Sequence, residues 1–189
     1  MATHVALLRG INVGGKNKVA MADLREVVAE LGHDDVSTYI QSGNVLFSPD
    51  QGDADTSALA AALAAAITDR LGVSAPVVVL TRDELAAAIA ANPFPAEPDP
   101  KRVHAVLLSG ALGAEAAGKI DDALARSAGK DARDELATVG RTLYLHTPDG
   151  FGNSELAAAV LRIVTSPRAG VTGTARNWAT MTKLLELCG

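Results

Sequence analysis

The residues best suited to chemistry lie in one glycine-rich stretch near the start of the chain, RGINVGGKNK (9–18). Gly10 to Lys16 has the spacing of a nucleotide-binding P-loop, G-x-x-x-x-G-K, whose main-chain N–H groups and lysine hold phosphates. Asn17, however, stands where such a loop needs Ser or Thr to bind Mg²⁺. The neighbouring hairpins also predict antiparallel strands, whereas P-loops sit in parallel sheets. We therefore reject the P-loop interpretation.

The same stretch keeps the residue types of a simpler anion site. Gly14–Gly15 can form a nest of main-chain N–H groups, and Arg9, Lys16 and Lys18 add positive charge. Asn12 is a short polar side chain that can orient a ligand. The alternative is purely structural: a tight turn at the glycines, local backbone bonds from the asparagine, and solvated lysines.

A second polar turn, Ser42-Gly43-Asn44, joins two β-rich runs at 36–41 and 45–47. Glycine favours a hairpin here because it adopts positive φ without steric cost. In the strand order 4-1-3-2 of a βαββαβ unit, the loop after the first strand and the central hairpin lie at one edge of the sheet. We expect the two segments to form a common ligand-binding rim.

Other chemistry has weak support. Two histidines, His4 and His33, belong at the opposite edge of the same sheet, and His104 and His146 lie on predicted neighbouring strands, where they could face each other. Two histidines are too few for a structural zinc site, and we predict no metal site. The sequence does not reveal whether the protein is an enzyme or which cofactor it would use.

The elements that position these residues repeat. The first half reads as strand 5–8, helix 21–31, strands 36–41 and 45–47, helix 57–71 and strand 77–80. The second reads as strand 103–108, helix 115–126, strands 136–139 and 143–146, a helix capped by Asn153 or Ser154, strand 171–174 and a final helix striped by Trp178, Met181, Leu185 and Cys188.

This order predicts an α+β protein of two tandem ferredoxin-like (βαββαβ) halves with antiparallel sheets and helices packed on them. We place the first half at 1–80, a helix and Pro-rich linker at 81–101, and the second half with its final helix at 102–189. The helix after residue 80 starts with a capping box of Thr81 and Glu84.

Composition limits the partners. A net charge of −5 and a pI near 5.3 make non-specific nucleic-acid binding unlikely, because that needs a broad basic surface. No run approaches the ~18 apolar residues of a membrane span, so we expect no membrane partner. The single cysteine, Cys188, fits a reducing compartment. With no signal peptide visible, we predict a cytoplasmic location.

Four segments, VALLRGINVGGKNKVAMADLR, TYIQSGNVLF, NPF and RNWATMTKL, resemble the bacterial family called domain of unknown function 1697 (DUF1697). The resemblance runs nearly end to end and implies two tandem ferredoxin-like halves, with no established activity. The signature positions that match are Arg9, Gly10, Asn12, Gly14, Gly15, Ser42, Gly43, Asn44, Arg176, Asn177 and Trp178. Two positions, Glu155 and Ala175, depart from the basic residue and threonine often found there in the family.

Among the C-terminal signature residues, Arg176 is the candidate ligand contact, since a guanidinium grips phosphate or carboxylate with two bonds. Asn177 would cap the last helix, and Trp178 would anchor it in the core. The leading hypothesis is a site for a small anionic or phosphorylated ligand at loop 9–18 and hairpin 42–44. The alternative is a non-enzymatic protein- or RNA-interaction module.

Overall fold

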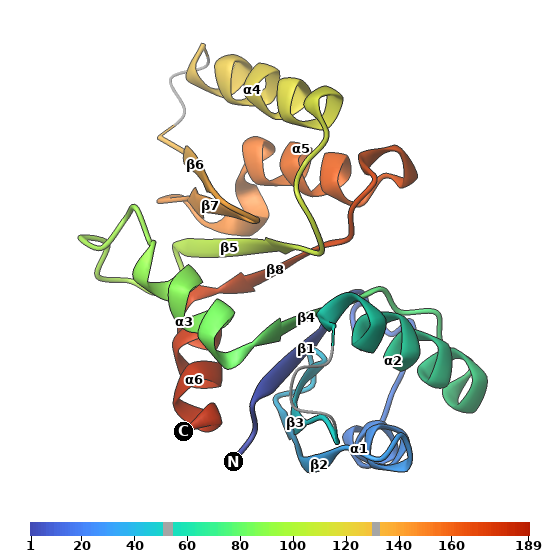
Figure 1. Ribbon diagram of the computed structural model, residues 1–189. Helices are drawn as coiled ribbons and strands as arrows, with labels where there is room; N and C mark the ends of the chain where they lie inside the picture. The colour runs from blue at the N-terminus through green and yellow to red at the C-terminus, as the bar shows by residue number, and fades with distance from the viewer. Residues whose placement is uncertain (51–54, 130–132) are drawn as a thin grey trace. The chain divides into compact units, whose positions relative to one another are not determined.

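The computed structural model describes residues 1–50, 55–129 and 133–189, which divide into two compact units. The first unit comprises Met1–Ala87 and Lys183–Gly189, and the second comprises Ala88–Thr182. Both boundaries fall inside helices, α3 (Arg82–Ala90) and α6 (Trp178–Cys188). Each unit contains one four-stranded antiparallel sheet (Figure 1), which confirms the α+β class. The division at residues 80 and 102 stays a prediction.

The sheet of the first unit has the strand order β2-β3-β1-β4. The strands are β1 (His4–Leu8), β2 (Asp34–Tyr39), β3 (Asn44–Ser48) and β4 (Val77–Thr81). Strand β1 is central and pairs with β3 and β4, with Ala6 opposite Val45 and Val79. All five residues of β1 are buried. A strand between two neighbours and covered on both faces reads as a continuous apolar run, as His4–Leu8 nearly does.

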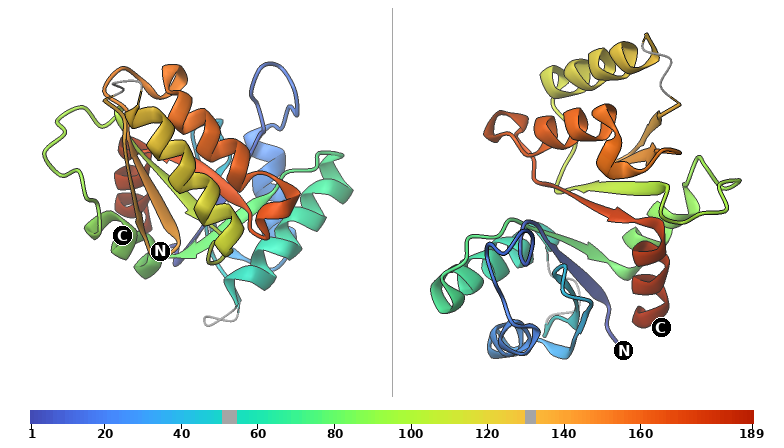
Figure 2. Two further views of the ribbon diagram at one scale, coloured as in Figure 1. Left: turned by 90° about the horizontal axis from the view of Figure 1, so that it is seen from above. Right: turned by 180° about the vertical axis from the view of Figure 1, so that it is seen from behind.

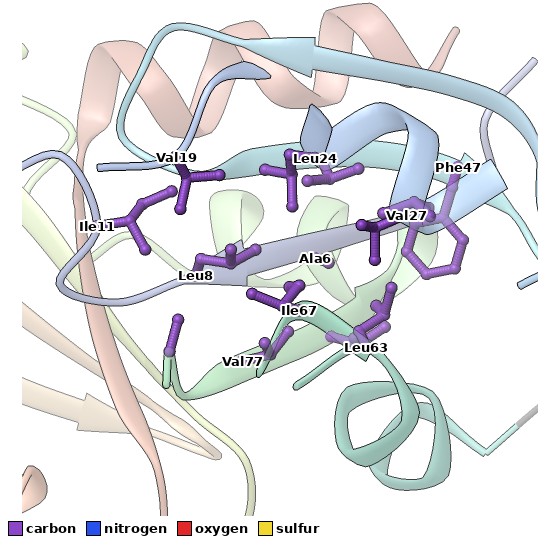
Figure 3. Close-up of a cluster of buried hydrophobic side chains, with 14 of the residues drawn as sticks. Ala6, Leu8, Ile11, Val19, Leu24, Val27, Phe47, Leu63, Ile67 and Val77 are labelled. Atoms are coloured by element: carbon purple, nitrogen blue, oxygen red, sulfur yellow. The ribbon is translucent and has the colours of Figure 1, made fainter. Parts of the chain in front are cut away.

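Helices α1 (Met21–Glu30) and α2 (Thr56–Leu71) cover one face of this sheet (Figure 1). Their apolar residues recur every three or four positions, so each helix turns one stripe inward. Leu24 and Val27 of α1 meet Leu63 and Ile67 of α2 over Ala6 in the core (Figure 3). Helix α2 ends at Gly72, which adopts the left-handed conformation with φ 66°.

The second unit repeats the arrangement with the strand order β6-β7-β5-β8. Its strands are β5 (Val103–Leu108), β6 (Glu135–Val139), β7 (Thr142–His146) and β8 (Gly173–Asn177). Helices α4 (Ala114–Ala128) and α5 (Glu155–Val164) cover one face of this sheet, as both views in Figure 2 show. Short 3₁₀ turns, η1 (Phe151–Asn153) and η2 (Pro167–Ala169), flank α5.

Side-chain caps fix several helix starts as predicted. Thr81 and Glu84 form the capping box, each side chain bonding the other's main-chain N–H. Ser154 caps α5 by accepting from the N–H of Ala157 at 2.8 Å. Asn177 caps α6 by accepting from the N–H of Thr180 at 2.9 Å. These caps satisfy N–H groups that have no partner within their own helix.

Two predicted strands are shifted. The second strand spans 34–39 rather than 36–41, because Ile40 already has φ 48° and begins the turn. The last strand spans 173–177 rather than 171–174, because its register with β5 runs from Leu108–Gly173 to His104–Asn177. Gly173 permits close packing there: a Cβ at this position would lie 2.7 Å from Val164. Pairing with β5, which lies far away in the sequence, sets both ends of the last strand.

Candidate functional site

Loop 9–18 and the turn between β2 and β3 come together in the first unit. The N–H of Leu8 donates to the carbonyl of Gly43 at 2.8 Å. Asn12 Nδ2 donates to the carbonyl of Gln41 at 3.0 Å. A Cβ at Gly43 would lie 2.7 Å from Leu8 Cβ and 2.9 Å from Ile11 Cδ1. We call residues 9–18 and 40–44 together the rim.

The loop is anchored at its ends and exposed in its middle. Ile11 and Val19 are buried and point into the same core as Leu8 (Figure 3). Residues 13–18 between them are all exposed. Figure 2 shows this loop, in blue between β1 and α1, as a long arch that projects from its unit. Anchored ends let the exposed residues keep a defined position.

Asn12 closes the loop with three hydrogen bonds. Besides the bond to Gln41, its Nδ2 donates to the carbonyl of Val19 at 2.9 Å, and its Oδ1 accepts from the N–H of Val19 at 2.9 Å. Its φ of 54° is in the left-handed region, which asparagine tolerates better than most residues. Asn17, with φ 49°, donates from Nδ2 to the carbonyl of Gly10 at 3.0 Å. Both asparagines therefore hold the loop's own shape.

The middle of the loop is a small hairpin. Gly14 and Gly15 have φ of 59° and 76°, and the N–H of Lys16 donates to the carbonyl of Val13 at 3.1 Å. Positive φ at both central residues is the pattern of a type I′ turn. The N–H of Asn12 bonds the carbonyl of Asn17 in the same ladder. The main-chain N–H of Lys16 is thus already bonded within the protein, so the predicted nest has one N–H group fewer for an anion.

In the facing turn, Asn44 also serves the fold. It is fully buried, and its Nδ2 donates to the carbonyl of Tyr39 and to Ser42 Oγ, both at 3.0 Å. Gly43, with φ 80°, gives the close approach to Leu8 described above. Ser42 remains exposed. Of the three predicted residues, Ser42 is exposed, whereas Gly43 and Asn44 are buried.

The positive charge of the rim comes from three side chains. Lys16 and Lys18 are exposed and make no ion pair with any residue the structure describes. Arg9 is half-buried, its N–H donates to the carbonyl of Pro76 at 2.9 Å, and burial lowers the pKa of its guanidinium below the usual value. An anion approaching the loop would meet these three cations at its exposed middle and its base.

Two apolar residues of the rim were not predicted as site residues. Val13 is 67% exposed at the hairpin tip, and Ile40 is 50% exposed in the facing turn. Ile40 has φ 48°, a conformation that a β-branched residue rarely adopts. Such strain persists only where the surroundings impose it, and it often accompanies function. No sequence signal marks it, because isoleucine normally indicates strand or core.

Arg176 lies on β8 in the second unit, whereas the other predicted site residues lie in the first. It is buried, and its Nη1 donates to Thr174 Oγ1 and to the carbonyl of Ala175, both at 2.9 Å. Burial lowers its pKa to about 10, so it still carries its charge at neutral pH. Its ligand role stays a prediction.

The histidines occupy two separate settings. His4 and His33 both pack on Phe47, with ring centroids 5.7 and 4.9 Å away, and burial lowers both pKa values. The idea that His104 and His146 face each other is wrong. His104 is opposite Leu145 in the register, so neighbouring His146 points to the other face of the sheet.

In the second unit, His104 stacks on Phe151 at 3.9 Å. His146 instead binds two carboxylates, at 2.7 Å to Glu97 and 2.9 Å to Glu135. Among residues 1–50, 55–129 and 133–189, no group of three or more metal-binding side chains comes together. Within the same ranges, no helix is both long and apolar enough to cross a membrane.

Comparison with known proteins agrees with the sequence motifs. A structure described as that of conserved bacterial protein SP0830 from Streptococcus pneumoniae is similar to this chain, with a TM-score of 0.69 and 23% identity. The alignment covers 100% of this chain and 99% of the other, and at this identity it shows a shared fold. No functionally curated protein matches the chain. The family model described as protein of unknown function (DUF1697) matches residues 1–144, and the chain therefore belongs to that family.

Proposed function

We propose that the protein binds a small anionic or phosphorylated ligand at the rim of its first unit. The observation that carries the proposal is the set of hydrogen bonds from the Asn12 side chain to the Gln41 carbonyl and to the main chain of Val19. These bonds hold an exposed loop against a second turn. Fixed geometry matters because a preformed site loses less conformational freedom on binding.

Asn12, Asn17 and Asn44 hold the rim together, and the exposed Lys16 and Lys18 are the side chains that we expect to contact the ligand. The exposed Ser42, whose Oγ accepts from Asn44 Nδ2 at 3.0 Å, is a third candidate contact. Arg9 adds charge at the base of the loop. Two lysines suit phosphate as point charges, and a serine hydroxyl can donate to a phosphate oxygen. With a predicted cytoplasmic location, the ligand would be a phosphorylated metabolite.

A thermal-shift screen of phosphorylated metabolites tests this proposal. We expect a ligand that raises the melting temperature of the wild type, with at least about tenfold weaker binding in a Lys16→Gln/Lys18→Gln variant, since each lost charge-assisted bond costs about 1.5–3 kcal/mol. The matched control is Arg25→Gln/Arg70→Gln, which removes two exposed charges elsewhere in the same unit. If both variants bind like the wild type, the rim is not the site.

A protein partner at the same rim is the second candidate function. The exposed Val13 and Ile40 favour it, because apolar side chains at the tips of two neighbouring turns suit contact with another apolar surface. RNA binding has less support, since Phe47, the one aromatic residue of β3, is fully buried and cannot stack on a base.

We also infer that each unit is ferredoxin-like. The order β2-β3-β1-β4, repeated as β6-β7-β5-β8, is the arrangement expected for a βαββαβ unit, and two helices cover one face of each sheet. The proposed rim then lies at the end of the sheet where the first loop and the central hairpin meet.

A further inference from the structure

A cavity of about 190 Å³ opens on the second unit where α4, α5 and η2 meet. Its polar lining comes from Glu115 and Lys119 of α4, Arg162 of α5, Ser166 just before η2, and Arg168 within η2. All five belong to the second unit, so this cavity shares no residue with the rim. Nothing in the proposed function uses it.

The lining has an excess of positive charge in a protein whose net charge is −5. Three cationic side chains face one acid, and that acid, Glu115, is already paired with Lys119 at 2.6 Å. Arg162 and Arg168 form no ion pair within the part of the chain that the structure describes. On α5 the neighbours of Arg162 three and four residues away are Ala, Ala, Thr and Ser, so no intrahelical acid can pair with it.

The chemistry of the lining suits a phosphate group. A guanidinium presents two parallel N–H donors that match two phosphate oxygens. Ser166 Oγ accepts from the N–H of Arg168 at 3.3 Å, which leaves its hydroxyl hydrogen for an anion. The volume limits the ligand, because pockets for drug-sized molecules occupy roughly 300–1,000 Å³. A small phosphate ester fits this size better than a nucleotide does.

We propose that this cavity is a second anion site, which binds the phosphate group of a small phosphate monoester through Arg162, Arg168 and Lys119, with Ser166 as a hydroxyl donor. The proposal is independent of the rim. It assigns a binding role to the helical layer of the second unit, whereas the rim belongs to the loops of the first.

NMR titration of the ¹⁵N-labelled full chain tests the proposal, with inorganic phosphate and glycerol 3-phosphate as probes and sodium chloride matching the ionic strength. We expect saturable shifts of the amide signals at 115–119 and 162–169. In an Arg162→Gln/Arg168→Gln variant the dissociation constant should rise at least about tenfold, since two charge-assisted contacts are lost. Both arginines are exposed, so we expect the variant to fold normally. Unchanged amide signals away from the cavity check this.

The matched control is Arg126→Gln/Arg133→Gln, which removes the same charge from the same unit outside this cavity. At the signals of residues 115–119 and 162–169, this control should give the dissociation constant of the wild type. Equal weakening in the control would mean general attraction to the unit and would overturn the proposal. Unchanged affinity in the Arg162/Arg168 variant would overturn it as well. Preference for glycerol 3-phosphate over inorganic phosphate supports a monoester as the ligand, and preference for inorganic phosphate would overturn that assignment.

Discussion

Gly43 is the residue at which the turn between β2 and β3 comes closest to the base of loop 9–18. Its φ of 80° is unfavourable for any residue with a side chain, and a Cβ would lie 2.7 Å from Leu8 Cβ. Leu8 belongs to a central, fully buried strand and has little room to move. Both strain and overlap therefore oppose a larger residue.

We expect Gly43→Ala to lower the free energy of unfolding by about 3 kcal/mol, as the sum of left-handed strain and overpacking. Gly14→Ala is the control: it has φ 59° but open space around its Cβ, so only the strain of about 1 kcal/mol applies. Urea unfolding followed by circular dichroism measures both. Equal losses in the two variants would show that packing at Leu8 adds nothing.

At this scale the sequence predicted which residues would meet, because glycine and asparagine mark turns and the strand order places those turns together. It did not predict which hydrogen bonds their side chains would form. Asn12 and Asn44 bond carbonyls at Gln41, Val19 and Tyr39, and such a choice of acceptor depends on how distant segments approach. An asparagine available to a ligand and one that holds a loop look alike in sequence.

At the scale of elements, one Pro-rich segment is attached by a histidine. Residues 91–102, which we call the Pro-rich strap, join α3 to β5 with little regular structure. His146, at the end of β7, binds Glu97 of the strap on one side and Glu135 of β6 on the other. Its ring also packs on Phe94 of the strap, with centroids 5.4 Å apart. One imidazole ring thus joins the strap to the sheet.

The pKa of His146 controls this attachment. Burial alone would lower the pKa, but hydrogen bonds and charges from Glu135 and Glu97 outweigh burial and raise it above the usual 6.5. A raised pKa in the folded state means that stability is fully present below pH 6.5 and is lost as the pH rises through the folded value.

We therefore expect the stability difference between wild type and His146→Gln to shrink as the pH rises from 6 to 9, measured by urea unfolding. NMR titration of the His146 ring should give a pKa above 6.5, and Glu97→Gln should lower it by removing one carboxylate. A pKa at or below 6.5 in the wild type would contradict the two-carboxylate account. The strap was predicted from its prolines, but its attachment to His146 was not, since 49 residues separate the partners.

For the whole molecule, we expect three histidines to make the fold sensitive to acid. Burial lowers the pKa of His4 and of His33. It also lowers the pKa of His104, to about 4. Glu84 and Asp50 partly oppose this at the first two. A lowered pKa in a base means that the neutral form stabilises the fold. That stability is present above pH 6.5 and is lost as the pH falls through the acid range.

We expect the free energy of unfolding to fall as the pH drops from 6.5 to 4. The contribution of His146, in contrast, is lost as the pH rises. His104→Phe should reduce the acid loss, because it keeps a ring against Phe151 and removes the proton site. Urea unfolding at half-unit pH steps measures both proteins. Parallel curves would show that His104 is not a major source of the acid loss.

At this scale the sequence predicted the order of elements in both halves, because hydrophobic periodicity, caps and turn glycines are local signals. Pairing between distant strands was harder to predict. The final strand starts two residues later and ends three residues later than predicted, because its register with β5 decides its ends. The similar structure with 23% identity shows how few residues need be shared for this fold. The fold therefore depends more on the pattern of apolar, capping and turn residues than on particular side chains.

The first unit is built from two segments that lie far apart in the sequence, since residues 183–189 belong with 1–87. Arg82 Nε donates to the carbonyl of Gly189 at 2.7 Å, and Gly189 lies against the side chain of Met1. During synthesis, residues 1–87 must therefore wait for residues 183–189 before the packing of their unit is complete. Nascent polypeptides stalled before residue 183 would expose that vacancy to proteases, although their second sheet has already been translated.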